Sequence, residues 1–106
     1  MTIEKLKELI TSGEKIDVEL KKSRNEITKD VYDTVCSFNN RNGGHIFFGV
    51  FDSKMILGVE EAAIDKMLKD FTTAINNPGK IYPPIYLTPE IYEIEPGKKI
   101  IYVYVQ

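Results

Sequence analysis

Apolar residues recur at helical spacing in three parts of the chain. The three stripes are Ile3, Leu6, Leu9 and Ile10; Ile27, Val31, Val35 and Phe38; and Ile64, Met67, Leu68, Phe71 and Ile75. Steps of three and four residues place each stripe on one face of a helix. Gly13, the run NNRNGG at 39–44 and the run NNPG at 76–79 are typical helix ends. The pattern predicts a short N-terminal helix and two long helices.

Five segments have the pattern of strands. In the run DVELKKS, Val18 and Leu20 alternate with charged residues, which predicts one apolar and one charged face. The run HIFFGVF at 45–51 does not alternate, as is typical of a strand buried on both faces. The run MILGV at 55–59 is predicted to pair back on it as a hairpin. EIYEI at 90–94 and KKIIYVYV at 98–105 predict a second hairpin, with Pro96 and Gly97 in a type II turn.

Together these elements predict one α+β domain over residues 1–106. Its mixed, largely antiparallel sheet of about five strands should have the two long helices packed on it and the short N-terminal helix alongside. The segment 80–89 contains three prolines and cannot be a central strand throughout. No repeat or linker divides the 106 residues.

The composition narrows the functional classes. Hydrophobic residues make up 42% and charged residues 28% of the chain, as in ordinary globular domains. No apolar run approaches the roughly 20 residues that span a bilayer, so no membrane partner is expected. The single cysteine, Cys36, excludes an internal disulfide and fits a cytoplasmic protein. With only His45 beside it, a zinc site of Cys/His type is not expected.

The abrupt change from NNRNGG to an apolar strand marks a candidate site. A helix that ends near Phe38 must reverse into a strand, and Gly43 or Gly44 can supply the positive φ that this reversal needs. The side chains of the run and the backbone N–H groups at the glycines could hold a phosphate or a base edge. A merely solvated helix end accounts for the run equally well. The candidate side chains are those of Asn39, Asn40, Arg41 and Asn42.

The runs GEKIDVELKKS and VCSFNNRNGGHIFFGVFDSKMILGV, in this order, resemble the Schlafen/AlbA-like domain. The matching positions are Glu14, Glu19, Lys21, Ser23, Phe38, Asn39, Gly43, Gly44, Gly49, Val50, Asp52, Gly58 and Val59. Leu20 and His45 depart from the family pattern, which usually has an aromatic and a small hydroxyl residue there. The resemblance implies a nucleic-acid-binding, most simply DNA-binding, module at the N-terminus of a longer bacterial or archaeal transcriptional regulator. Family domains generally continue for another strand or two beyond the point that matches Gln106.

The charge distribution agrees with an anionic partner without requiring one. The chain has a net charge of −2, yet residues 20–54 contain six basic and four acidic residues, a local balance of +2. A solvated surface with charges of both signs explains the same numbers. If the domain binds nucleic acid, one continuous surface should contain the basic residues of this part together with the Asn-rich run. Five of the six are expected on this surface: Lys21, Lys22, Arg24, Arg41 and Lys54.

Two alternatives to a nucleic-acid-binding module stay open. By resemblance, Glu14, Glu19 and Asp52 match the acidic trio of the Schlafen ribonucleases, which implies a nuclease dependent on Mg²⁺ or Mn²⁺. The same side chains could instead form a surface ion pair with Lys21 and serve the turn at 52–54. Binding rather than catalysis is the default expectation, with no metal and no cofactor. The other alternative is a dimerisation or docking domain, with homo-oligomers forming through a C-terminal hairpin at the edge of the sheet.

Overall fold

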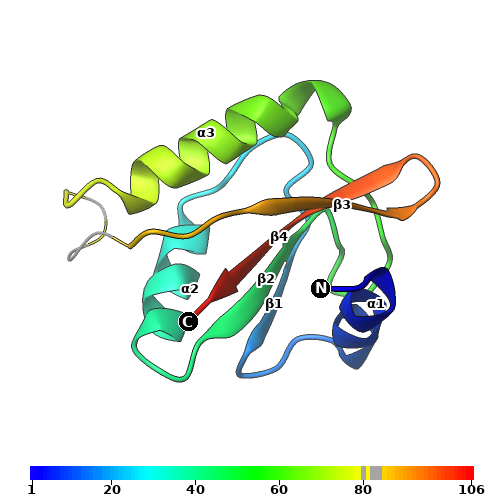
Figure 1. The fold of residues 1–106 in the computed structure, drawn as a ribbon, viewed down its shortest axis with the longest axis horizontal. Coiled ribbons are helices and arrows are strands. Elements are labelled where there is room, and N and C mark those ends of the chain that lie inside the picture. Colours follow the sequence, from blue (N-terminus) through cyan, green and yellow to red (C-terminus); the bar gives the residue numbers. More distant parts are fainter. Residues whose placement is uncertain (80, 82–84) are drawn as a thin grey trace.

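The computed structural model describes residues 1–79, 81 and 85–106, which form a single α+β unit (Figure 1). The helices are α1 (Ile3–Ser12), α2 (Asp30–Asn39) and α3 (Ile64–Ile75), and a 3₁₀ turn, η1 (Glu61–Ala63), leads into α3. The strands are β1 (Val18–Lys21), β2 (Gly44–Phe48), β3 (Glu90–Glu95) and β4 (Lys98–Val105). The three predicted helices are thus present, although α1 is as long as α2, with 10 residues each.

The strands form a mixed sheet in the order β1-β2-β4-β3. β1 pairs with β2 in parallel, and both β2–β4 and β3–β4 are antiparallel pairs. Gly97, with φ 76°, lies in the turn between β3 and β4, as the type II turn requires. The mixed, largely antiparallel character of the sheet is therefore confirmed.

The prediction of a fifth strand at 55–59 is wrong. In this segment only Ile56 forms a bridge, to Val50, and no ladder follows. Both edges of β2 are already occupied, by β1 on one side and by β4 on the other. The N–H groups of Leu57 and Gly58 instead both donate to the Gly49 carbonyl, each at 2.8 Å. The segment 49–59 therefore forms a compact loop across the end of the sheet.

The two faces of the sheet have separate cores. On one face, α2 and α3 pack their apolar stripes against Ile46 and Phe48 of β2 and against alternate residues of β4 (Figure 1). On the other face, Leu6 and Ile10 of α1 pack against Val18, Leu20 and Phe47. Glu19 and Lys21 alternate with Val18 and Leu20 along β1, so they lie on the α2 side of the sheet. This alternation brings charged groups of β1 close to the start of α2.

The C-terminal strand does not lie at the edge of the sheet. β4 lies between β2 and β3, so its backbone is paired on both sides, and the two edge strands of the sheet are β3 and β1. The β3 edge carries Glu90, Glu93 and Glu95, charges that discourage pairing with another copy. The C-terminal hairpin therefore does lie at an edge of the sheet, but its open strand is β3 and not the last strand, β4. Residues 80 and 82–84 of the proline-rich segment lie outside the described residues, and 85–89 form no strand.

Among the described residues, no helix is long and apolar enough to cross a lipid bilayer.

Candidate functional site

The parallel pair β1–β2 has two ends with different surroundings. At the turn end, the N–H of His45 donates to the Asp17 carbonyl at 2.8 Å, just after the Asn-rich run. At the loop end, the N–H of Gly49 donates to the Lys21 carbonyl at 2.8 Å, where the loop 49–59 begins. A strand of four residues separates the two ends by about 10 Å. The candidate residues divide between these two ends.

The two glycines explain how the chain reverses at the turn end. Gly43 has φ 89°, and its N–H donates to the Phe38 carbonyl at 3.0 Å, which closes the end of α2. A Cβ on Gly43 would lie 2.2 Å from the carbonyl oxygen of Val105 in β4. A Cβ on Gly44 would lie 2.5 Å from the buried ring of Phe38. The predicted positive φ is confirmed at Gly43, while Gly44 is needed because there is no space for a side chain.

The Asn-rich run forms an exposed rim at this end. Asn39, Asn40, Arg41 and Asn42 are all exposed. Arg41 and Asn42 line a pocket of about 450 Å³ together with Ile16, Asp17 and Gly43. Arg41 takes part in no ion pair with any residue that the structure describes. Its guanidinium is therefore available to an anionic ligand.

Three further cations gather at the loop end. Lys22 places its ammonium 5.6 Å from the centre of the Phe51 ring, a favourable cation–π position. Arg24 donates from Nε to the Gly58 carbonyl at 3.4 Å. Lys54 has φ 76°, unusual for a lysine, and its side chain runs beside Gly13. Within the described part of the chain, none of these three has a carboxylate partner.

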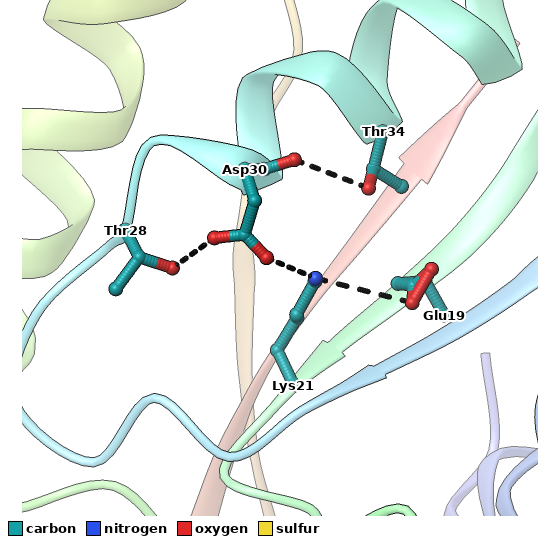
Figure 2. Close-up of polar contacts among 5 residues, drawn as sticks. All are labelled: Glu19, Lys21, Thr28, Asp30 and Thr34. Carbon is teal, nitrogen blue, oxygen red and sulfur yellow. Dashed lines mark hydrogen bonds and ion pairs between the residues drawn. The ribbon is translucent and has the colours of Figure 1, made fainter.

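Lys21 is different, because it is enclosed in an ion-pair network (Figure 2). Its Nζ lies 2.5 Å from Oδ2 of Asp30, the first residue of α2, and 4.0 Å from Oε2 of Glu19. Thr28 donates its hydroxyl to the other oxygen of Asp30. Burial alone lowers the pKa of Lys21, but the hydrogen bond to Asp30 and the nearby carboxylates outweigh it and raise this pKa. The prediction that Lys21 belongs to a free basic surface is therefore corrected, because its charge is already neutralised by Asp30 and Glu19.

Glu14, Glu19 and Asp52 form what we call the carboxyl cluster. Glu14 shares hydrogen bonds with the carboxyl groups of Glu19 and Asp52. The hydrogen bond to Glu19, burial and the two neighbouring negative charges raise the pKa of Glu14 from 4.5 to about 7. However, no three His, Cys, Asp or Glu side chains among the described residues are arranged to hold a metal ion. The cluster is therefore arranged for proton sharing and does not fit a bound cation in this conformation.

The basic residues do not form the one continuous surface that the charge pattern predicts. Arg41 lies at the turn end, whereas Lys22, Arg24 and Lys54 lie at the loop end. A groove of about 290 Å³ beside β1 and α2 is lined by Arg41, but also by Glu19 and Asp33. Acidic groups therefore separate the two basic areas on this side. The partnership of Asp30 with Lys21 was also missed, because it depends on where α2 begins against β1.

Comparisons with known proteins agree with this architecture. The model of the family described as Schlafen, AlbA_2 matches residues 14–106. An uncharacterized ATP-binding protein of Ureaplasma parvum serovar 3 is 35% identical over 71 residues, which is 64% of this chain. The chain spans only 20% of the length of that curated relative. The relative's remaining length has no counterpart here.

Two solved structures share the fold. The N-terminal domain of an ATP-dependent DNA helicase RecG-related protein from Nitrosomonas europaea has a TM-score of 0.69 at 17% identity, covering 99% of this chain and 72% of that chain. The DIP2311 protein of Corynebacterium diphtheriae has a TM-score of 0.56 at 16% identity, covering 97% of this chain and 25% of that chain. Identities this low show a common fold and no more.

Proposed function

The chain belongs to the Schlafen, AlbA_2 family, and on this premise we propose that it binds DNA as a module of a transcriptional regulator. The observation that carries the proposal is that most basic side chains of the candidate surface are not in ion pairs. Of the five basic residues in the candidate surface, Lys21 alone is in an ion pair among the described residues. Lys22, Arg24, Arg41 and Lys54 are exposed without a carboxylate partner in the same part of the chain. Unpaired cations at both ends of one strand pair suit contact with successive phosphates.

The relatives limit how far the proposal goes. The Ureaplasma parvum protein is named for ATP binding, but this chain covers a fifth of it. The chain has no Gly-x-x-x-x-Gly-Lys-Ser/Thr run with which to cradle a nucleotide triphosphate. We therefore do not extend ATP binding to this domain. Transcriptional regulation would require further domains. The part of the proposal that these residues carry is the contact with DNA.

The test is a binding titration of a labelled DNA duplex by fluorescence anisotropy over a series of salt concentrations. Binding by the parent should be weak and should fall with salt, by about 0.9 in the logarithmic slope for each phosphate contacted. Lys22→Glu combined with Arg41→Glu should abolish binding and leave the circular dichroism spectrum unchanged, since both side chains are exposed.

A matched control reverses two other exposed lysines, Lys7 on α1 and Lys69 on α3. This variant has the same net charge as the first and should lose only the small part of the affinity that depends on net charge. Equal affinity of both double variants for the duplex would show that Lys22 and Arg41 do not contact DNA.

A second candidate function, a metal-dependent nuclease, is favoured by the meeting of the three carboxyl groups. It faces two obstacles: the cluster has no cation-holding arrangement, and Lys21 is engaged by Asp30. Titration with Mn²⁺ in a calorimeter, followed by a cleavage assay on transfer RNA, tests it. Heat of binding that disappears in Glu19→Gln, together with cleavage that requires Mn²⁺, would establish this function in place of simple binding.

A further inference from the structure

An aromatic surface lies at the turn end, on the face of the sheet that α1 covers only in part. His45 and Tyr104 are direct partners across β2 and β4, and their ring centres are 5.1 Å apart. Tyr102 lies next to them, and its hydroxyl is 2.7 Å from Nδ1 of His45. We call these three side chains the Tyr104 platform. Its rings are held in place by the ladder and by this hydrogen bond.

The platform is uneven in its exposure. Tyr102 is 2% exposed and belongs to the core under α1. Tyr104 is 45% exposed, and no helix among the described elements covers its ring. Burial lowers the pKa of His45, so the imidazole is mainly neutral at pH 7 and presents a flat, uncharged ring. A large aromatic ring fixed in a strand and open to solvent is well suited to stack against another flat group.

Hydrogen-bonding groups surround the exposed ring. Tyr104 lines a pocket of about 430 Å³ whose other walls include amides, a hydroxyl and a second tyrosine. Among them are Asn39, Tyr86, Thr88, Glu90 and Gln106. Tyr86 is 80% exposed, more than any other large hydrophobic side chain that the structure describes. Amide groups can both donate to and accept from the edge of a nucleobase, and a carboxylate can accept from it, whereas a purely apolar partner would leave these groups unsatisfied.

No cation lines this pocket among the described residues, and its connection to positive charge runs through Asn39. Asn39 links the pocket to the Asn-rich run that contains Arg41, whose guanidinium has no ion pair among the described residues. The negative charge of Asp17 and the positive charge of Lys5 of α1 both act on His45, in opposite directions. The pocket is thus lined by aromatic and amide groups together with Glu90, and Arg41 lies two residues along the chain from Asn39. Single-stranded nucleic acid has the complementary arrangement, with bases that stack and phosphates that alternate with them.

We infer that the Tyr104 platform binds an unpaired base of single-stranded DNA, stacked on Tyr104, with Arg41 near the adjoining phosphate. The inference rests on the proposed function and deepens it, because it names an unpaired stretch of the strand as the ligand. A paired base could not reach the ring, since its faces are covered by its neighbours in the duplex. The ring contacts are the same for RNA, because none of them involves the 2′-hydroxyl.

The experiment compares three labelled single strands of about 15 nucleotides, near the upper end of the site sizes of single-strand-binding OB-fold domains. They are oligothymidylate, oligouridylate and an abasic DNA strand that keeps the phosphates but has no bases. Tyr104→Ala should weaken the binding of oligothymidylate about tenfold, the usual order for one lost stack. Oligouridylate should show the same loss. Tyr104→Phe keeps the ring and should bind within about twofold of the parent.

The abasic strand separates stacking from phosphate contacts. The parent and Tyr104→Ala should bind it equally, since there is no base to stack, whereas Arg41→Ala should weaken the binding of all three strands. Tyr86→Ala, in a segment with no regular structure, provides a variant that cannot disturb the sheet and should also weaken oligothymidylate alone.

The outcomes distinguish the two proposals. If Tyr104→Ala and Tyr86→Ala bind oligothymidylate as tightly as the parent while Lys22→Glu with Arg41→Glu does not, the stacking site is refuted and DNA binding stands. If Tyr104→Ala weakens the abasic strand just as much, the residue acts through the fold and the inference fails. If the parent binds neither the single strands nor a duplex, both proposals fail.

Discussion

The two ends of the β1–β2 pair both carry polar side chains but satisfy them differently. At the loop end, Lys21 is neutralised by Asp30 and Glu19, and Glu14 shares hydrogen bonds with Glu19 and Asp52. At the turn end, Arg41 has no ion pair among the described residues and Tyr104 has an exposed ring. At the loop end an internal ion-pair network lies beside unpaired cations, whereas the turn end has no such network among the described residues.

The difference shows that a count of charges does not locate a binding surface. Lys21 and Arg41 each contribute one positive charge to the sequence. The side chain of Lys21, however, is only 18% exposed, because it is directed at the first residue of α2. Around it, the loop end retains Lys22, Arg24 and Lys54 as unpaired cations at its rim. What matters for an anionic ligand is therefore the residual charge after internal pairing.

The largest effect should come from filling the turn itself. Gly43→Ala places a Cβ 2.2 Å from the Val105 carbonyl at a φ of 89°, so the clash and the strained backbone add up. We expect a loss of about 3 kcal/mol or more in the free energy of unfolding. Gly97→Ala is the matched control, because its φ is 76° but nothing lies within 4 Å; it should cost about 1 kcal/mol. Urea denaturation measures both, and equal costs would show that the approach of β4 does not constrain the turn.

The next effect tests the internal pairing at the loop end. Lys21→Met leaves the Asp30 carboxylate without its ammonium partner and removes the contact with Glu19. Because Asp30 is 60% exposed and partly screened by water, we expect a loss of only about 1–2 kcal/mol in the free energy of unfolding. Lys22→Met makes the same substitution one residue further and should change stability by less than about 0.5 kcal/mol. Similar losses in the two variants would remove the distinction between a paired and an unpaired lysine.

Much of the fold follows from local patterns in the sequence. The stripe from Ile64 to Ile75 and the position of Gly43 can be predicted because helix periodicity and a tight reversal depend on neighbouring residues. The supposed strand 55–59 could not be excluded in this way. Its partner edge on β2 is taken by β4, about 50 residues later in the chain. Local hairpin signals do not reveal that competition.

The candidate site was predictable to a similar degree. The convergence of Glu14 with Glu19 and Asp52 agrees with the family resemblance, and hydrogen bonds join the three side chains. The contact of Asp30 with Lys21 and the exposed ring of Tyr104 were missed, because each depends on how distant elements lie together. The sequence did contain a signal for Tyr104: Tyr102 and Tyr104 alternate with valines, so both face the same side of the sheet as His45.

A smaller effect should appear in the pH dependence of stability. The pKa of Glu14 is about 7 in the folded chain against an ordinary value of 4.5, so the folded state holds this proton more tightly. The resulting stabilisation is complete below the ordinary value and is lost as the pH rises through about 7. Because Glu14 is exposed, solvent screening should keep the loss between about pH 5 and about pH 8 under roughly 1 kcal/mol.

Glu14→Gln should remove this decline, since glutamine keeps a hydrogen-bonding group and cannot ionise. Urea denaturation of the parent and the variant at the two pH values measures the difference. Glu4→Gln, on the exposed side of α1, should follow the profile of the parent. A parent that becomes more stable over the same range, with Glu14→Gln flat, would show that the carboxyl cluster binds protons less tightly than its hydrogen bonds indicate.

The smallest effect concerns the salt dependence of duplex binding, and it asks whether one DNA molecule contacts both ends. Lys22→Ala and Arg41→Ala each remove one unpaired cation, so each should reduce the logarithmic salt slope by about 0.9 if its side chain contacts a phosphate. Lys21→Met should leave the slope unchanged, because the charge of Lys21 in the parent is already neutralised by Asp30. The outcomes distinguish one contact from two. If the duplex spans both ends, the variant with both substitutions should show the sum of the two reductions in slope. If it contacts only one end, the single variant at the other end will keep the slope of the parent. The acidic groups between the ends, Glu19 and Asp33, favour a DNA path that avoids the groove. A slope that falls with Lys21→Met as much as with Lys22→Ala would mean that DNA displaces Asp30 from Lys21, and the two ends would then differ only until the ligand binds.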